Sequence, residues 1–140
     1  MTDKCKVDEV KSRQRKAFVT VGALNKDGKV IGAAQLSSLK TDKKFLWLHE
    51  IEVRPQCRRK GVGSAMMDKI VEIGKKIDAE LIYAYPATPM ETSGKTLTPK
   101  QLGAFYKKEG FEPCNAPKDV ATITDEGLFK RGVCLKLKKT

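Results

Sequence analysis

Strand-forming residues dominate two stretches near the start of the chain, residues 17–24 and 30–36. Asn25-Lys26-Asp27-Gly28-Lys29 lies between them, and Asp-Gly between two such runs is a strong β-hairpin signal because glycine accepts the positive φ of the turn. A polar turn at residues 40–44 then leads into a third such stretch, 45–53. The pattern therefore predicts three consecutive antiparallel strands.

A change of period after residue 61 predicts a helix. Apolar residues recur at spacings of four, four, three and four, namely at Val62, Met66, Ile70, Ile73 and Ile77. That spacing is typical of an amphipathic helix. Strand formers return at residues 81–85, and a crossover of this length makes strands 45–53 and 81–85 parallel.

The rest of the chain predicts a loop, a second helix and a last strand. Residues 86–97 contain prolines, a glycine and hydroxyl residues, which is typical of a loop. Thr98-Pro99-Lys100-Gln101 has the form of a helix start with a capping box, and Gly110 ends the helix as a positive-φ cap. Within residues 128–140, a strand is indicated by alternating Val133, Leu135 and Leu137.

Length and composition favour one folded domain over residues 1–140. The chain is 40% hydrophobic and 32% charged, so it is neither disordered nor fibrous. It contains no uninterrupted apolar run of about eighteen residues, and its first six residues have no apolar signal core. We therefore expect a cytoplasmic protein without a membrane partner.

The cysteines and the single histidine predict no metal site. Cys5, Cys57, Cys114 and Cys134 stand far apart, and only His49 could join them, whereas a zinc site needs about four clustered ligands. The count of four allows disulfides. Without a secretory signal, however, we expect reduced thiols, with Cys57 an ordinary loop thiol.

The net charge of +11 implies an anionic partner: nucleic acid, an acidic surface or a polyphosphate ligand. The basic runs at residues 4–16 and 130–139 are either solvated faces or a groove for an acidic acceptor. No aromatic residues are interleaved with them to stack on single strands. Charge alone does not choose among these partners.

The sharpest local feature is the basic turn Arg58-x-x-Gly61-x-Gly63 between a predicted strand and the long helix. The first amides of a helix have no internal partners, and glycines let a phosphate approach the backbone. Arg58, Arg59 and Lys60 would add positive charge. The turn matches neither the Walker pattern nor the dinucleotide fingerprint. A tight basic turn before an ordinary helix remains the alternative.

Two motifs in order resemble those of the GNAT superfamily of N-acyltransferases. Residues 48–67, which include the basic turn, resemble its central acyl-CoA motif, and Phe105-Tyr106-Lys107-Lys108-Glu109-Gly110-Phe111 resembles its second motif. The resemblance covers about residues 30–112. It implies an α/β (α+β) fold with a mixed, mostly antiparallel central sheet, a splayed parallel strand pair and covering helices.

The N-terminal region is shortened relative to this family. About sixteen residues precede the first predicted strand, where the family usually has a strand and two helices. We therefore expect an open acceptor site, completed by residues 86–97, a second subunit or a macromolecular acceptor.

The resemblance implies acetyl-CoA as cosubstrate, bound where strand 45–53 splays from strand 81–85. Pantetheine would pair with the backbone of strand 45–53, and pyrophosphate with the amides of the basic turn. The implied cofactor-binding residues are Ile51, Glu52, Val53, Arg58, Arg59, Lys60, Gly61, Val62, Gly63 and Ser64. The amine attacks the thioester directly in this family, with the Val53 amide as oxyanion donor.

The implied catalytic side chains are an acid and a base. Tyr106 matches the family's general acid, and its alternative role is to pack the helix on the sheet. The base is placed on strand 45–53, and His49 and Glu50 are the first candidates, ahead of Glu52. Simple alternation would put His49 and Ile51 on one face of the strand and Glu50 on the other. The family, however, often has a bulge near Val53.

We therefore expect an acetyl-CoA-dependent N-acetyltransferase for an amine of unknown identity, with a homodimer among the candidate assemblies. A non-catalytic acyl-CoA-binding module and a basic nucleic-acid-binding domain are the two alternatives.

Overall fold

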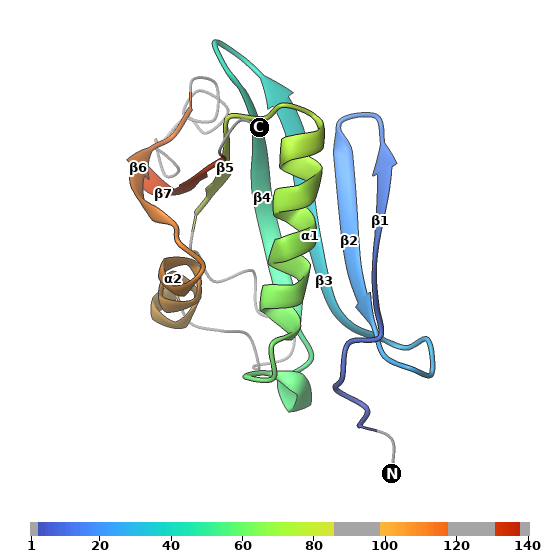
Figure 1. The fold of residues 1–140 in the computed structure, drawn as a ribbon. Helices are drawn as coiled ribbons and strands as arrows, with labels where there is room; N and C mark the ends of the chain where they lie inside the picture. Colours follow the sequence, from blue (N-terminus) through green and yellow to red (C-terminus); the bar gives the residue numbers. More distant parts are fainter. Residues whose placement is uncertain (1–2, 86–98, 118–130, 138–140) are drawn as a thin grey trace.

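A computed structural model of the protein describes residues 3–85, 99–117 and 131–137. Its central feature is a seven-stranded sheet (Figure 1). The strands are β1 (Glu9–Arg15), β2 (Phe18–Leu24), β3 (Val30–Lys40), β4 (Lys44–Val53), β5 (Leu81–Ala84), β6 (Glu112–Asn115) and β7 (Arg131–Lys136). The helices are α1 (Val62–Lys76), α2 (Pro99–Lys108) and the short 3-10 helix η1 (Pro55–Cys57).

The sheet is mixed and mostly antiparallel, with the order β1-β2-β3-β4-β5-β7-β6. Only the β4–β5 pair is parallel within the described residues, because α1 carries the chain from one strand to the other. This arrangement confirms the predicted fold class.

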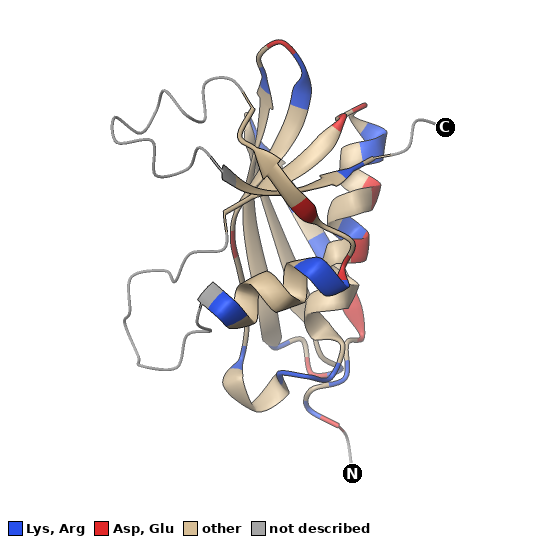
Figure 2. Cartoon of the chain, turned by 90° about the vertical axis from the view of Figure 1, so that its left-hand side faces the viewer, with Lys and Arg blue, Asp and Glu red and all other residues tan. Residues whose placement is uncertain are grey.

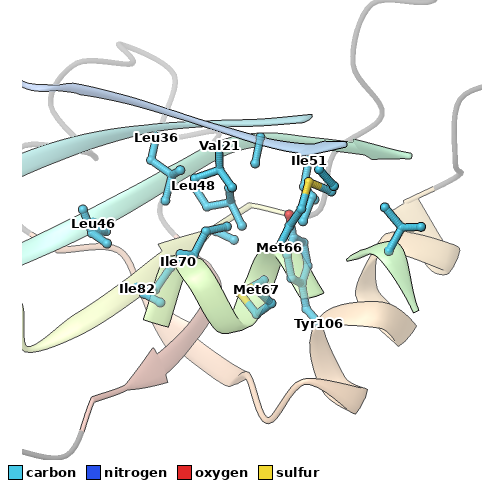
Figure 3. Close-up of a cluster of buried hydrophobic side chains, with 14 of the residues drawn as sticks. Val21, Leu36, Leu46, Leu48, Ile51, Met66, Met67, Ile70, Ile82 and Tyr106 are labelled. Atoms are coloured by element: carbon cyan, nitrogen blue, oxygen red, sulfur yellow. The ribbon is translucent and has the colours of Figure 1, made fainter. Parts of the chain in front are cut away.

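Helix α1 covers one face of the sheet, and the main core lies between them (Figure 3). Its apolar residues Met66, Met67 and Ile70 pack against Val21, Leu36, Leu46 and Leu48 of the strands. The helix approaches β3 closely at Gly32, where a Cβ atom would lie 2.9 Å from Val62 and 2.8 Å from Met66. The predicted helical period thus becomes the buried face of α1.

The opposite face of the sheet carries a smaller core at one end. Phe45, Leu81, Tyr83 and Cys134 form it, and a disulfide joins Cys134 of β7 to Cys114 of β6. Gly132 allows this packing, since a Cβ there would meet the Ala84 carbonyl oxygen and the Tyr83 hydroxyl.

A second disulfide fastens the N-terminal segment. Cys5 is bonded to Cys57 of η1. The side chain of Asn25, 4% exposed in the β2–β3 hairpin, donates from Nδ2 to the Lys4 carbonyl oxygen at 3.0 Å. Its Oδ1 accepts from the amides of Asp27 and Lys29 and so closes the predicted turn, in which Gly28 has a φ of 76°.

The cysteine prediction is therefore wrong: all four cysteines are disulfide-bonded, and Cys57 is not a loop thiol. Sequence spacing could not show the pairing, because the partners lie 52 and 20 residues apart and meet only through the folded sheet.

Two strands escaped prediction. β1 occupies residues that we had left unassigned, so the strand that the family places there is present, while the described residues before β2 contain no helix. β6 contains Pro113 and has only four residues. The predicted loop 86–97, the Thr98 cap and residues 128–130 lie outside the described residues.

Candidate active site

Strands β4 and β5 separate half-way along β4. Their parallel pairing runs from Phe45 with Leu81 to Leu48 with Ala84, where β5 ends. β4 continues to Val53 beside β3 alone. The predicted splay is therefore present, and one side of residues 49–53 has no strand partner among the residues that the structure describes.

A β-bulge lies at the start of this splay, at His49. Leu36 pairs with Leu48 and Gln35 with Glu50, so His49 is the extra residue. The bulge lies four residues before the expected position. It reverses the alternation, so that Ile51 joins the core under α1 while His49 and Glu50 share the other face. Our assignment of His49 and Glu50 to opposite faces was therefore wrong.

The backbone beyond the bulge presents amides to the splay. The Arg54 amide donates to the Ile31 carbonyl oxygen at 2.9 Å. Because hydrogen-bonded pairs alternate along an antiparallel ladder, the amides of Ile51 and Val53 point away from β3, while that of Glu52 points toward it. Two of the three β4 residues in the predicted cofactor site thus offer N–H groups to the open side.

The basic turn leads directly into α1. Gly61 is its N-cap, with a φ of 83°, and the first helical hydrogen bond runs from the Ala65 amide to the Gly61 carbonyl oxygen at 3.0 Å. The preceding amides therefore have no partner within the helix, and its first turn holds no acidic residue. Arg58 folds back so that Nε donates to the Val53 carbonyl oxygen at 3.3 Å.

Helix α2 packs against this same end of α1. A Cβ at Gly63 would lie 2.9 Å from Phe105 Cε1, so the second glycine of the turn permits helix packing. Ser64 Oγ also donates to Glu109 Oε2 at 3.1 Å, just beyond the end of α2. We had assigned both residues to phosphate binding alone; these contacts to α2 depend on tertiary structure and had no sequence signal.

A cleft of about 740 Å³ joins the end of β4, the basic turn and α2. The predicted cofactor residues that line it are Ile51, Val53, Arg58, Arg59, Gly61, Val62, Gly63 and Ser64. Glu52 and Lys60 do not line it. Sequence reasoning placed only Tyr106 of α2 in the site and missed Gln101, Phe105 and Lys108, which line the opposite wall.

Tyr106 lies beneath the cleft rather than in its wall. The side chain is 3% exposed and packs beside Ile51 and Met66, with the Phe111 ring at a centroid distance of 5.1 Å (Figure 3). No hydrogen bond to its hydroxyl occurs within the described part of the chain. Burial raises the pKa of Tyr106 far above its ordinary value, so the phenol stays protonated at neutral pH.

His49 lies on the face away from α1, beside two polar or aromatic neighbours. Its Nε2 is 2.6 Å from Ser37 Oγ, and its ring lies 4.4 Å from that of Trp47, between centroids. The ring is exposed on one side, and partial desolvation lowers the pKa of His49 below its ordinary value, which favours the neutral imidazole. Glu50 follows it on the same face and is half-buried.

Charge surrounds the cleft. Basic residues lie on the chain entering α1 and on α2 (Figure 2). Among the described residues, no group of three His, Cys, Asp or Glu side chains could hold a metal ion. The helices in these same ranges include none long and apolar enough to cross a bilayer.

Comparisons with known proteins agree with this geometry. The sequence profile of the Acetyltransferase (GNAT) family matches residues 3–97. A search of curated protein sequences found no significant match.

Three similar solved structures illustrate the likeness in fold. A GNAT-family acetyltransferase from Staphylococcus aureus Mu50 has a TM-score of 0.64 and 20% identity, over 87% of this chain and 69% of its own. Nourseothricin acetyltransferase has a TM-score of 0.59 and 21% identity, over 87% and 65%. The PaiA N-acetyltransferase of Thermoplasma acidophilum, solved with coenzyme A, has a TM-score of 0.57 and 17% identity, over 87% and 62%. This chain thus spans less than two thirds of the length of the last two proteins.

Proposed function

The chain belongs to the GNAT acetyltransferase family, and from that premise we propose that it is an acetyl-CoA-dependent N-acetyltransferase acting on an amine. The observation that carries the proposal is the 740 Å³ cleft. It brings together the β4 amides that point away from β3, the N-terminus of α1 and the cations of the basic turn. Its volume falls within the range of about 300–1,000 Å³ that is typical of cofactor sites.

The residues in the cleft fit acetyl-CoA. The amides at the start of α1 and the guanidinium groups of Arg58 and Arg59 suit a pyrophosphate. The N–H groups of Ile51 and Val53 suit the amides of a pantetheine arm. The coenzyme A complex of the Thermoplasma acidophilum protein supports this assignment by analogy of fold. When bound, acetyl-CoA supplies a thioester that an amine can attack.

The remaining roles belong to the chain's own residues. Neutral His49, or Glu50 beside it, takes the ammonium proton of the acceptor. The Val53 amide points into the splay, where it can donate to a developing oxyanion. Tyr106, protonated at neutral pH, is the proposed general acid for the leaving thiolate. We keep Tyr106, His49 and Glu50 as the proposed catalytic residues.

Calorimetric titration with acetyl-CoA and with CoA, each at two salt concentrations, tests the cofactor site. Gly61→Glu places a carboxylate where the phosphates would bind, and we expect it to weaken binding about a hundredfold, since like charges in contact cost several kcal/mol. Gly28→Glu is the matched control, because Gly28 also has a positive φ and open space around it. Equal binding by the two variants would remove the basic turn from the site.

Thiol release from acetyl-CoA with a panel of primary amines then tests catalysis. Saturable binding without any thiol release would favour a non-catalytic acyl-CoA-binding module. Binding to oligonucleotides that weakens steeply with salt and needs no acetyl-CoA would favour a nucleic-acid-binding domain.

The proposal extends to the whole of residues 1–140 as one catalytic domain, with a homodimer still a candidate assembly. A cytoplasmic location remains our prediction from the sequence. The two disulfides weigh against it, since disulfides are rare in that compartment.

A further inference from the structure

The face of the sheet opposite α1 is uncovered by any described helix across β1, β2 and β3. Val19, Val21 and Ala23 of β2 point into the core under α1, so Phe18 and Thr20 point to the other side. Phe18 is 64% exposed there. The register therefore determines which residues of the neighbouring strands share that open face.

Two rows of paired residues cross this face from the edge strand to the candidate base. One row runs from Arg13 through Thr20 and Gln35 to Glu50. The other runs from Arg15 through Phe18 to Ser37, whose hydroxyl is hydrogen-bonded to His49. Each row spans three inter-strand spacings of about 4.8 Å, or about 14 Å in all.

The two ends of these rows carry opposite charge. At the β1 end, a shallow hollow of about 380 Å³ is lined by Arg13, Arg15, Lys16, Phe18 and Thr20. Within the described residues, Arg13 and Arg15 form no ion pair. At the β4 end, the carboxylate of Glu50 lies beside the splay, and Glu52 follows on the same face. The residues between them, Thr20 and Gln35, are uncharged.

We propose that the acceptor is an acidic peptide segment whose amine lies at His49 and Glu50 while its carboxylates bind Arg13, Arg15 and Lys16; this rests on the proposed function. This face, with cations on β1 and carboxylates on β4, fits a ligand that has an ammonium group at one end and anionic groups about 14 Å away. An extended peptide advances about 3.3 Å per residue, so the carboxylates lie about four residues from the amine.

A peptide fits the whole arrangement better than a nucleic acid does. The carboxylate of Glu50 attracts an ammonium group and would repel a phosphate backbone that continued along the row. The exposed ring of Phe18 between the cations offers an apolar contact to a side chain or to the peptide's own methylenes. The nitrogen forms a bond to the acetyl carbon and the carbon–sulfur bond of the thioester breaks. One proton of the ammonium passes to the base, and the second ends on the departing thiolate.

Kinetics with two matched peptides test the proposal. One has a lysine with glutamates four and five residues after it, and the other has glutamines at those two positions. We expect Arg13→Gln with Arg15→Gln to raise KM for the glutamate peptide about tenfold at low salt without changing kcat. The glutamine peptide should be unaffected. Lys75→Gln with Lys76→Gln removes the same charge from the outer part of α1 and should change neither constant.

Fluorescence anisotropy of the labelled glutamate peptide separates this inference from the proposed function. Peptide binding that needs Arg13 and Arg15 but gives no thiol release would overturn catalysis and leave the docking surface standing. Thiol release with equal KM for the two peptides would overturn the docking surface alone. Displacement of the peptide by a single-stranded oligonucleotide that binds more tightly, through the same arginines, would also overturn it.

Discussion

The imidazole of His49 and the hydroxyl of Ser37 are joined across two strands, with 2.6 Å between Nε2 and Oγ. The register shift in β3 lies between Gln35 and Leu36, next to Ser37, and His49 is the bulged residue of β4. The contact therefore anchors the bulged residue on the uncovered face, to which the bulge also brings Glu50. It also places a nitrogen with a lowered pKa beside the point where β5 leaves β4.

The pH dependence of turnover tests the role of His49. Only the neutral imidazole accepts a proton, so kcat should fall as the pH drops through the pKa of His49, which burial holds below 6.5. We expect His49→Gln to remove this acidic limb and to lower kcat by about 10² to 10⁴ at neutral pH. The Glu50→Gln variant should still show the fall in kcat at acidic pH. If His49→Gln kept it and Glu50→Gln lost it, Glu50 would be the base.

Substitution of Tyr106 should separate activity from stability. The hydroxyl is buried without a described partner, so Tyr106→Phe should leave the Tm unchanged or raise it. We expect kcat to fall about a hundredfold while the Kd for acetyl-CoA stays constant. Because burial raises the pKa of this phenol, no alkaline loss of activity below about pH 10 should come from its ionisation.

Tyr83→Phe is the control for Tyr106. Burial and the neighbouring Tyr85 raise the pKa of Tyr83 to about 12, but it lies in the smaller core on the other face. The residue is fully buried and has further interactions, so the variant should lose stability and keep kcat. Unchanged kcat in both variants would remove Tyr106 from the mechanism.

The disulfides provide a matched pair of changes. Cys5→Ala with Cys57→Ala opens a cross-link over 52 residues, and Cys114→Ala with Cys134→Ala opens one over 20. Chain entropy predicts losses of about 4 and about 3 kcal/mol in the free energy of unfolding. Only the first pair touches the cleft, since Cys57 lines it next to Arg58.

We therefore expect calorimetry to show acetyl-CoA affinity reduced about tenfold in the Cys5/Cys57 variant and unchanged in the Cys114/Cys134 variant. The physical reason is that the freed turn must be ordered on binding. Equal affinity in the two variants would show that the turn holds its shape without the cross-link.

Alanine substitution should lower the free energy of unfolding at Gly63 and raise it at Gly103. The Cβ of Gly63→Ala would press on the Phe105 ring at 2.9 Å, and we expect a loss of about 1–3 kcal/mol in stability. Gly103 has open space around it within α2, so Gly103→Ala should gain up to about 1 kcal/mol from helix propensity. Urea unfolding measures both. A neutral Gly63→Ala would mean that α2 shifts freely on α1.

The parts of the fold that sequence reasoning found are those that local patterns determine. The 3.6-residue period of α1, the Asp27-Gly28 turn and the Gly110 cap, whose φ is 98°, all follow from single-segment physics. As expected, Phe111 folds back against α2: its amide donates to the Tyr106 carbonyl oxygen at 2.9 Å. The basic turn was predicted on the same grounds, whereas the splay was predicted from the family resemblance alone.

What the sequence did not reveal depends on contacts between distant segments. β1 has charged or polar residues on both faces, so it lacks the alternation that marks a half-buried strand. The bulge at His49 is a property of the β3–β4 register, and the disulfides need the sheet to bring their sulfurs together. The wall that α2 adds to the cleft likewise depends on Gly63 meeting Phe105.

The position of β1 at the edge of the sheet has a consequence for how the protein behaves when concentrated. An edge strand offers unpaired backbone groups to which another chain can add. If two copies paired antiparallel through β1 and aligned about Ser12, Lys11 of each would stand opposite Arg13 of the other. The repulsion between these cations disfavours this alignment and offsets the attraction of Glu9 to Arg15 in the same pairing. A dimer through β1 would therefore favour another alignment of the two strands.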